Sequence, residues 1–119
     1  MPSRPTPRRP PAAWYPKRGE VYLVALDKPR PAIVLSVNPL NQHSLDVCLV
    51  PVTSVQHREF RVRVHIHAGD GGLHADCWAK CDQVTTLEKT FLRYPPLGTL
   101  SDSTLANIQL QVKFALGLL

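Results

Sequence analysis

The chain has 119 residues, of which 44% are hydrophobic, and this size and composition indicate one small globular domain with a single core. No apolar run in it approaches the length of a membrane-spanning helix, which excludes an integral membrane protein of that kind. The formal net charge of +5 arises at one end, because residues 1–18 hold five of the 14 basic residues and none of the nine acidic ones. The rest of the chain is balanced, so it would bind a polyanion through a local patch rather than through a global field.

Residues 1–16 are rich in proline and arginine and contain six of the twelve prolines of the chain. They lack the continuous apolar segment of a secretory signal. We expect a disordered or polyproline-like leader over residues 1–16 and a folded domain over residues 17–119. The arginines of the leader either add affinity for phosphate groups or belong to a solvated extension without a function.

Three cysteines, Cys48, Cys77 and Cys81, form an odd set, which favours free thiols and a reducing, cytoplasmic compartment. His74 lies close to two of them in the sequence, but a structural zinc site needs four ligands with paired short spacings. We therefore predict no metal and no other cofactor. Cys48 lies within an apolar run and is interpreted as part of the core.

The first half of the chain contains three runs that are typical of buried strands. Residues 19–27 carry little polar content on either face, as expected near the centre of a small sheet. Residues 32–37 and 45–53 are rich in aliphatic and β-branched side chains. The segment 38–44 between them contains Asn, Pro and Ser and predicts a loop.

Residues 59–67 alternate apolar side chains with charged ones or imidazoles, which is the pattern of a half-buried antiparallel strand. Four basic or imidazole residues lie on the predicted wet face: Arg61, Arg63, His65 and His67. Such a strip either follows a phosphate backbone or is the solvent side of an edge strand, where basic residues discourage aggregation.

The second half continues with a glycine-rich turn at residues 69–72 and a strand over residues 75–86, and the pair Pro95-Pro96 interrupts the chain. A helix follows from Ser101, which with Ser103 is a candidate cap. Its apolar residues recur at intervals of three or four: Leu105, Ile108, Val112, Ala115, Leu116 and Leu119. The elements together predict a mainly β fold with one terminal helix, a small barrel or curled sheet on which the helix packs.

Polar chemistry stands at the ends of two of the apolar runs. Arg30 precedes the strand at residues 32–37, and Thr53 with Ser54 ends the strand at residues 45–53. A cation and two hydroxyls at strand ends suggest a site. Trp78 is a further candidate, either as a core residue or as a platform on which a nucleobase stacks.

Five short motifs in order resemble the MazF/PemK family of toxin endoribonucleases over most of residues 17–118. They are Lys17-Arg18-Gly19-Glu20-Val21-Tyr22, Arg30-Pro31, Pro51-Val52-Thr53-Ser54, Cys81-Asp82-Gln83-Val84-Thr85-Thr86-Leu87-Glu88-Lys89 and Leu97-Gly98-Thr99-Leu100-Ser101. The resemblance implies an SH3-like small barrel, which the CcdB-like toxins share, and a homodimer. It further implies metal-independent cleavage of single-stranded RNA, such as mRNA, and inhibition by a cognate antitoxin.

Carried over by position, the resemblance implies that Arg30 and Thr53 are the catalytic pair. Asn38 and Asn41 match polar loop positions of the family, and Gln83 matches a position near the RNA groove. The expected set of RNA-binding residues is Lys28, Asn38, Asn41, Ser54, His57, Arg61 and Gln83. One departure is the connection before Arg30, where only Lys28 and Pro29 follow Asp27 in place of the longer loop that family members usually carry.

The chemistry of the catalytic pair can also be argued from first principles. Without a metal, the ribose 2′-hydroxyl attacks its own phosphorus, so the enzyme must stabilise negative charge on the phosphoryl oxygens and move two protons. A guanidinium can hold two such oxygens, but it stays charged in proteins and is a poor base. His57 is a candidate for the proton transfer, and the structural alternative for Arg30 is an ion pair with Asp27.

Three functions therefore remain open at this point. The first is the endoribonuclease toxin. The second is a degenerate module of the same fold that binds RNA or protein without turnover. The third is a gyrase-directed, CcdB-like toxin, which would be expected to end in an exposed target-binding helix, whereas the apolar residues 116–119 look suited to burial.

Overall fold

Residues 20–24, within the apolar run at 19–27, form a central strand whose two faces are both buried. Val21 and Tyr22 are each fully buried, and they belong to two different hydrophobic clusters, one on each side of the sheet. This explains the absence of polar alternation, because a strand with two covered faces must be apolar on both. The prediction of a strand with two covered faces is confirmed for residues 20–24, whereas residues 25–27 belong to the connection that follows, where Leu26 is 49% exposed.

The computed structural model describes residues 8–56 and 62–118. Within these residues the elements are β1 (Glu20–Val24), β2 (Arg30–Val34), α1 (Asn38–His43), β3 (Asp46–Thr53), β4 (Arg63–Ile66), the 3₁₀ turn η1 (Asp70–Gly72), β5 (Cys77–Lys80), β6 (Thr85–Glu88), the 3₁₀ turn η2 (Lys89–Phe91), β7 (Leu92–Thr99) and α2 (Asp102–Ala115). In this described part no helix is long and apolar enough to cross a membrane.

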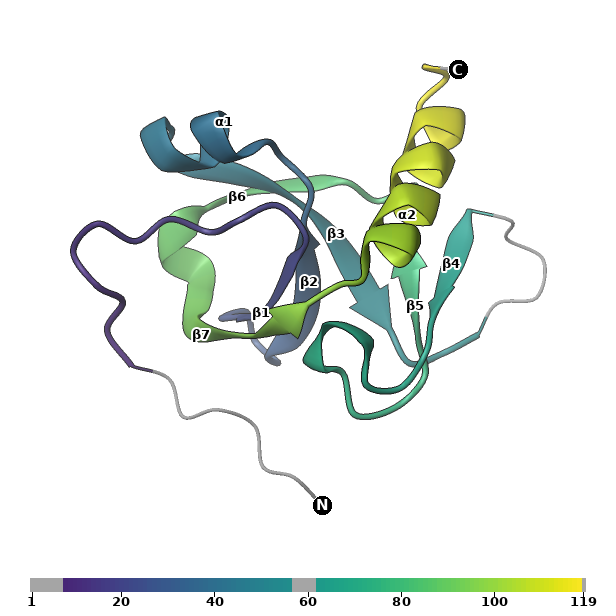
Figure 1. Ribbon diagram of the computed structural model, residues 1–119, viewed down its shortest axis with the longest axis horizontal. Helices are drawn as coiled ribbons and strands as arrows, with labels where there is room; N and C mark the ends of the chain where they lie inside the picture. Colours follow the sequence, from purple (N-terminus) through teal and green to yellow (C-terminus); the bar gives the residue numbers. More distant parts are fainter. Residues whose placement is uncertain (1–7, 57–61, 119) are drawn as a thin grey trace.

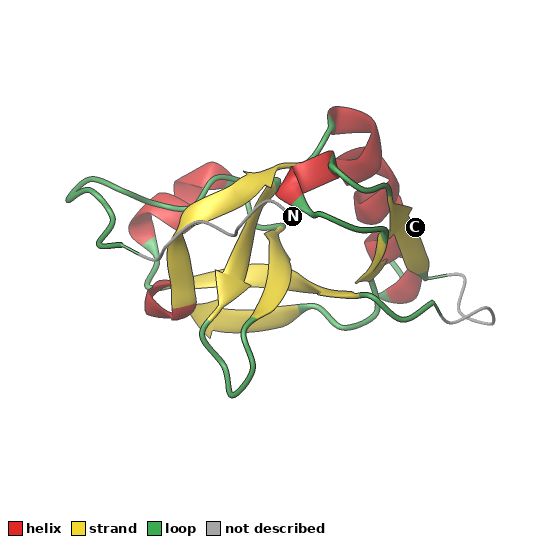
Figure 2. Ribbon diagram, turned by 90° about the horizontal axis from the view of Figure 1, so that it is seen from below, coloured by secondary structure: helices red, strands yellow, loops and turns green. Residues whose placement is uncertain are grey.

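The strands form one curled antiparallel sheet in the order β4-β5-β3-β2-β1-β7, with β6 paired to β3 (Figure 1). The long strand β3 makes the curl, because it pairs with β6 and β2 along its first part and with β5 at its end. Figure 2 shows the strands wrapping around a common interior. The fold is therefore mainly β with one terminal helix, as predicted.

The helix α2 covers one side of the sheet beside β4 and β5 (Figure 1). Ile108 and Val112 are its buried residues, and they join the larger of the two hydrophobic clusters. The predicted apolar stripe is confirmed at these positions but does not extend to the end of the chain. Leu116 and Leu118 are 50% and 66% exposed, so the expected burial of the last residues is wrong.

Three local predictions differ from the structure. Residues 38–43 form the short helix α1 rather than a loop, with a proline in its first turn, where the missing N–H costs nothing. The segment 75–86 is divided into β5 and β6, which pair with different parts of β3. Pro95 and Pro96 lie inside β7, which tolerates them because it is the edge strand of the sheet.

The packed part of the chain begins before the expected boundary at residue 17. Trp14 lies edge-on to the rings of Tyr22 and Tyr94, with centroids 6.0 and 6.1 Å away, and Pro16 is fully buried. The indole N–H of Trp14 donates to the Tyr22 hydroxyl at 3.2 Å, and that hydroxyl donates to Glu20 at 2.8 Å. Burial raises the pKa of Tyr22. The leader thus contributes an aromatic anchor, whereas residues 1–7 lie outside the described chain.

The carboxylate of Asp70 fastens η1 to the start of α2. It accepts hydrogen bonds from the Ser101 backbone N–H at 2.8 Å, the Ser101 hydroxyl at 3.0 Å and the Thr104 hydroxyl at 2.7 Å. Ser101 is also the N-cap of the helix, as predicted. Partial burial opposes ionisation of Asp70, but the hydrogen bonds outweigh it and hold its pKa below the ordinary value.

We expect Asp70→Asn to lower the free energy of unfolding by about 1–2 kcal/mol at neutral pH, since it weakens these bonds. A pKa that is lower in the folded than in the unfolded state gives stabilisation that is present above the ordinary pKa and lost as the pH falls through the folded value. Urea unfolding should therefore show the difference between the two proteins shrinking as the pH falls below the ordinary pKa of an aspartate, about 4. A difference that does not change with pH would contradict this role.

Candidate functional site

Arg30 and Thr53 are brought together by the pairing of β2 with β3. The ladder pairs Ile33 with Val50 and Ala32 with Pro51, and the same register continued by two residues sets Arg30 opposite Thr53. Directly opposed residues of an antiparallel pair point to the same face of the sheet. Two residues that are 23 positions apart in the sequence thus become neighbours at one edge of the barrel.

Both side chains line one cavity, with a volume of about 520 Å³, which we call the arginine-threonine cavity. Its lining residues are Pro29, Arg30, Pro31, Val52, Thr53, Ser54, Val55, Leu73, His74, Ala75 and Cys77. They come from the start of β2 with the residue before it, from the end of β3 with the two residues after it, and from the segment that follows η1 up to the first residue of β5. The cavity is therefore built from three separate stretches of the chain.

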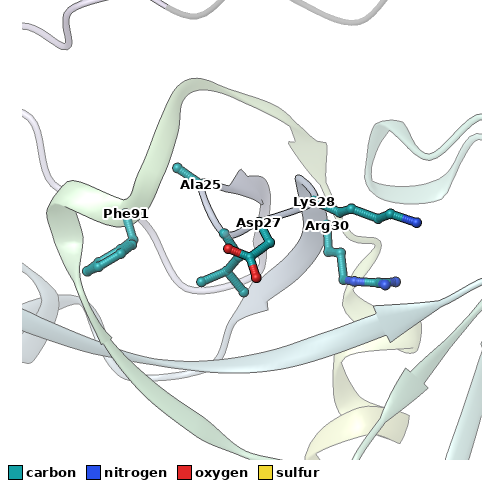
Figure 3. A pocket seen from close by; sticks show the side chains of 6 residues that line it. Ala25, Asp27, Lys28, Arg30 and Phe91 are labelled. Atoms are coloured by element: carbon teal, nitrogen blue, oxygen red, sulfur yellow. The ribbon is translucent and has the colours of Figure 1, made fainter.

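The guanidinium of Arg30 is available for a ligand. Arg30 is exposed, and in the described part of the chain its side chain makes no hydrogen bond or ion pair. Figure 3 shows Lys28 and Arg30 extending together from the β1–β2 connection, with the carboxylate of Asp27 turned the other way. The alternative role of Arg30 as a structural partner of Asp27 is therefore not supported by the geometry.

The hydroxyl of Thr53 is oriented by the chain that follows it. Its Oγ1 accepts a hydrogen bond from the backbone N–H of Val55 at 3.1 Å, and the side chain is half-buried. This bond uses a lone pair of the Thr53 oxygen, so the hydroxyl proton can still be donated to a group in the cavity. Thr53 can thus donate to an anionic oxygen placed beside Arg30.

The short connection between β1 and β2 leaves a second, open cavity beside the first. It has a volume of about 820 Å³ and is lined by Ala25, Leu26, Asp27, Lys28, Arg30 and Phe91 (Figure 3). Arg30 borders both cavities, and Lys28 adds a second exposed cation. The geometry therefore joins Lys28, Arg30, Thr53 and Ser54 into one continuous surface.

Other predicted residues lie elsewhere. Asn41 is fully buried, its amide nitrogen donates to the carbonyl of Ser36 at 2.8 Å, and its amide oxygen accepts from the Ser36 hydroxyl. The prediction that Asn41 contacts RNA is therefore wrong, because the amide of its buried side chain is hydrogen-bonded to Ser36 and so fixes α1 to the preceding chain. Asn38 is exposed, but its amide oxygen accepts from the Arg18 backbone N–H at 2.7 Å.

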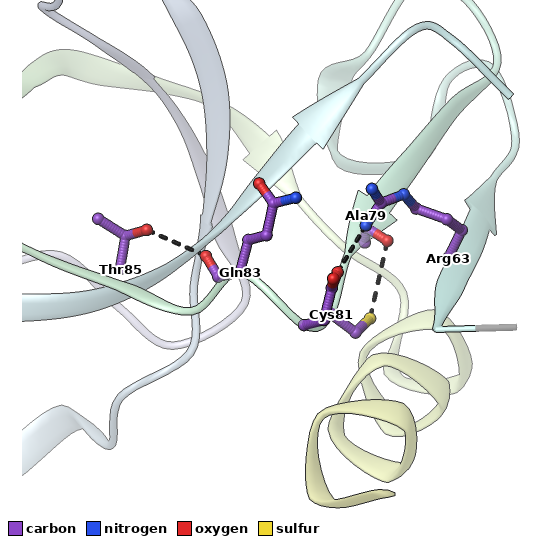
Figure 4. Close-up of polar contacts among 6 residues, drawn as sticks. Arg63, Ala79, Cys81, Gln83 and Thr85 are labelled. Carbon is purple, nitrogen blue, oxygen red and sulfur yellow. Dashed lines mark hydrogen bonds and ion pairs between the residues drawn. The ribbon is translucent and has the colours of Figure 1, made fainter. Parts of the chain in front are cut away.

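Gln83 follows β5 in the connection to β6, and its carbonyl oxygen accepts from the Thr85 hydroxyl at 3.0 Å (Figure 4). It is exposed and borders neither of the two cavities around Arg30. Its predicted contact with RNA is thus not part of the surface around Arg30. His57 and Arg61 fall outside the described residues.

Only part of the basic strip predicted on β4 is exposed to solvent. Arg63 forms an ion pair with Asp82 at 2.6 Å, and its side chain is 8% exposed. It is not a free surface cation, and the prediction that it lies on the wet face is wrong. The reason is that β4 lies beside β5, so the turn after β5 brings an acidic residue to it.

The three cysteines are free thiols, with Cys77 and Cys81 buried and Cys48 of intermediate burial. Burial, and then the carboxylate of Asp82, raise the pKa of Cys81 to about 12, so its thiol stays protonated near neutral pH. Its sulfur lies 3.8 Å from the carbonyl oxygen of Ala79, to which it donates (Figure 4). The cluster of ligand-type side chains found among the described residues does not include His74, Cys77 or Cys81.

Two further residues, His74 and Trp78, lie in this region of the structure. His74 is exposed and lines the arginine-threonine cavity, although the sequence suggested it only as a weak metal ligand. Trp78 pairs with Thr53 across the ladder of β3 and β5 and is half-buried, so the two residues share one face of the sheet, although Trp78 does not line the cavity. Their residue types were noted in the sequence, but their places near Arg30 and Thr53 depend on how β5 docks against β3.

Comparison with known proteins gives a consistent result over most of the chain. Residues 17–116 match the family described as PemK-like, MazF-like toxin of type II toxin-antitoxin systems. The chain is 30% identical over 116 residues to endoribonuclease MazF9 of Mycobacterium tuberculosis (strain ATCC 25618 / H37Rv), which covers 86% of this chain and 97% of that protein.

Solved structures agree with this match. An endoribonuclease in complex with its cognate antitoxin, from a mycobacterial species, superposes with a TM-score of 0.76 at 30% identity, covering 87% of this chain and 97% of the other. A chain from the MazE-MazF structure of Deinococcus radiodurans has a TM-score of 0.74 at 23% identity, covering 89% of this chain and 100% of the other. The latter shows the shared fold alone.

Proposed function

Because the chain belongs to the family of PemK-like, MazF-like toxins of type II toxin-antitoxin systems, we propose that it is an endoribonuclease that cleaves single-stranded RNA without a metal ion. The observation that carries the proposal is that Arg30 and Thr53 line the same cavity. The names of the relatives, an endoribonuclease of Mycobacterium tuberculosis and a mycobacterial one with its antitoxin, support the same reaction class.

In the proposed reaction, the ribose 2′-oxygen attacks the adjacent phosphorus and the bond from phosphorus to the 5′-oxygen breaks. The products are a 2′,3′-cyclic phosphate and a 5′-hydroxyl end. Negative charge builds up on the non-bridging oxygens during the attack, and the fork of Arg30 is suited to hold two of them. The hydroxyl of Thr53 donates to the same oxygens.

Two protons must move in this reaction, one from the 2′-hydroxyl and one to the 5′-oxygen. Arg30 cannot accept the first proton, because a guanidinium stays charged in proteins, and the proton for the 5′-oxygen comes from solvent water. We assign removal of the proton from the 2′-hydroxyl to the imidazole of His74, which lines the same cavity. His57, the earlier candidate, falls outside the described residues.

The open cavity beside Arg30 supports single-stranded RNA as the substrate. Bases must be splayed out to be recognised, and a cavity of about 820 Å³ with Lys28 and Phe91 in its lining offers a cation for phosphate and a ring for stacking. In place of a long covering loop, the connection here is short. We therefore propose that sequence selectivity comes from the walls of this cavity, with Lys28, Ser54 and Arg30 following the backbone.

We further propose a cognate antitoxin and a second copy of the chain as partners, acting in the cytoplasm where mRNA is translated. Four large apolar residues of α2 and the residues after it are 42–66% exposed, namely Leu110, Phe114, Leu116 and Leu118. An apolar surface of this kind is typical of a protein interface. Because these side chains are exposed, the expected burial of residues 116–119 no longer argues against a gyrase-directed toxin. The match to the family of PemK-like, MazF-like toxins argues against it instead.

The proposal is tested by incubating the purified protein with a defined single-stranded RNA in the presence of a chelator and analysing the ends of the fragments. We expect 2′,3′-cyclic phosphate and 5′-hydroxyl ends, and little cleavage of the same sequence as a duplex. Fragments with 3′-hydroxyl ends would contradict the mechanism. Intact RNA with retained binding would favour the degenerate module, and inhibition of gyrase without loss of RNA would favour the gyrase-directed toxin.

A further inference from the structure

The ladder between β4 and β5 places three ligand-type side chains together at one end. It pairs His65 with Trp78 and Ile66 with Cys77, and one further step in the same register sets His67 opposite Asp76. His65 and His67 are two residues apart and therefore point to the same face of the sheet. Two imidazoles and one carboxylate thus gather where the chain leaves β4 and enters β5.

The distances within this cluster suit a single ion. One ligand atom from each of His65, His67 and Asp76 lies within 4.8 Å of the others, and His65 Nε2 is 3.4 Å from Asp76 Oδ2. The two imidazole rings have centroids 4.2 Å apart. Around a zinc ion with bond lengths of about 2.0–2.2 Å, neighbouring ligand atoms lie roughly 3.3 Å apart, so small rotations of the side chains would suffice.

Neighbouring groups orient two of the three side chains. The backbone N–H of Ala68 donates to Asp76 Oδ1 at 2.8 Å, which leaves Oδ2 directed at His65. The indole of Trp78 stacks on His65, with centroids 5.2 Å apart and an angle of 18° between the rings. Contacts of this type around a metal site restrict ligand orientation and raise affinity.

We propose that His65, His67 and Asp76 form a binding site for a divalent transition-metal ion, with zinc as the expected occupant. Imidazole nitrogens favour zinc, nickel and copper, whereas calcium and magnesium require oxygen ligands almost throughout. Three protein ligands leave coordination positions for water, and all three side chains are exposed to it. A donor set of this kind binds reversibly rather than serving as a permanent part of the fold.

This site adjoins the proposed catalytic one but shares no residue with it, since Asp76 lies between Ala75 and Cys77 of the arginine-threonine cavity. None of its three residues lines the arginine-threonine cavity or the open cavity beside Arg30. Zinc binding is therefore compatible with RNA cleavage that needs no metal. The inference depends only on the geometry of β4 and β5, so it does not rest on the proposed function.

The test is isothermal titration of the full-length protein with zinc chloride at pH 7.5 in the presence of a non-thiol reductant. We expect binding of one ion per chain, weakened at least tenfold in His67→Ala and likewise in Asp76→Asn. His43→Ala and Cys48→Ser are the controls. His43 is an exposed histidine at the end of α1, and Cys48 is a thiol of intermediate burial, so both should leave the affinity unchanged.

A second measurement uses the stacking of Trp78 on His65. Nickel quenches indole fluorescence at short range, so titration with nickel should lower the tryptophan emission of the unmodified protein, and zinc should reverse the effect. Asp76→Asn should abolish most of the quenching. Absence of zinc binding, an affinity that both site variants leave unchanged, or an equal loss in His43→Ala would overturn the proposal.

Discussion

Arg30→Ala should lower the rate of RNA cleavage by about a hundredfold to a thousandfold while leaving the fold intact. Removal of one preorganised donor to a developing oxyanion commonly raises the barrier by about 3 kcal/mol, and Arg30 is the cation nearest to Thr53 in the cavity that they share. Its side chain is exposed and makes no bond within the described residues, so little stability depends on it. Single-turnover cleavage of a labelled single-stranded RNA measures the effect.

Lys113→Ala is the matched control for this experiment. Lys113 is an exposed cation in the last turn of α2, so its removal subtracts the same charge from the protein at another element. The cleavage rate of Lys113→Ala should stay within about twofold of that of the unmodified protein, because salt screens the effect of a surface charge that lies away from the site. Arg30→Lys should fall between the two, since it keeps the charge but loses the planar fork. Full activity of Arg30→Ala would refute the assignment.

Gly72→Ala should destabilise the fold by at least about 3 kcal/mol. Gly72 has a φ of +75°, and a Cβ added to it would lie 1.9 Å from the carbonyl oxygen of Leu97 and 2.4 Å from its carbonyl carbon. Both of these are backbone atoms, which cannot rotate away as a side chain can. Chemical denaturation, followed by circular dichroism, should show an earlier midpoint or, in the extreme, no cooperative transition.

Gly117→Ala separates the two causes of this loss. Gly117 has almost the same φ, +72°, but a Cβ there meets no atom within 4 Å. Its substitution should cost only the conformational penalty of about 1 kcal/mol. Equal losses in the two variants would show that the close approach of η1 to β7 is unimportant.

The contact at Gly72 also connects the stability of the fold to the candidate site. Gly98 of β7 faces the same approach, because a Cβ on it would lie 2.7 Å from backbone atoms of Gly71 and Gly72. The residues that directly follow Gly72 are Leu73 and His74, and both line the arginine-threonine cavity. Displacement of η1 would therefore move His74 away from Arg30, and we expect cleavage to fail before global unfolding does.

The residues predicted to bind or act on a ligand fall into two groups in the structure. Arg30 and Thr53 were predicted from their places at the ends of apolar runs, and the register of β2 with β3 brings them into one cavity. Asn41 was expected to bind RNA from the family resemblance and Arg63 to lie on a wet face from the alternation of its segment, but one is buried in α1 and the other is paired with Asp82. Polarity alone therefore does not distinguish a residue that binds a ligand from one that completes the fold.

The sequence by itself determined those features that depend on local patterns. The apolar runs at β1, β2 and β3 required buried strands, and the spacing of Ile108 and Val112 required an amphipathic helix capped at Ser101. Each of these follows from the periodicity of a single segment, since a strand repeats every two residues and a helix every 3.6. The motifs of the family were likewise readable without coordinates.

Only the tertiary structure decided the features that arise between segments far apart in the chain. The anchoring of Trp14 on Tyr22, the division of residues 75–86 into two strands that pair with different parts of β3 and the placement of His74 and Arg30 around one cavity all depend on which segments lie side by side. Neither local propensity nor spacing encodes such contacts, because they form only when the sheet curls and pairs residues that are distant in sequence.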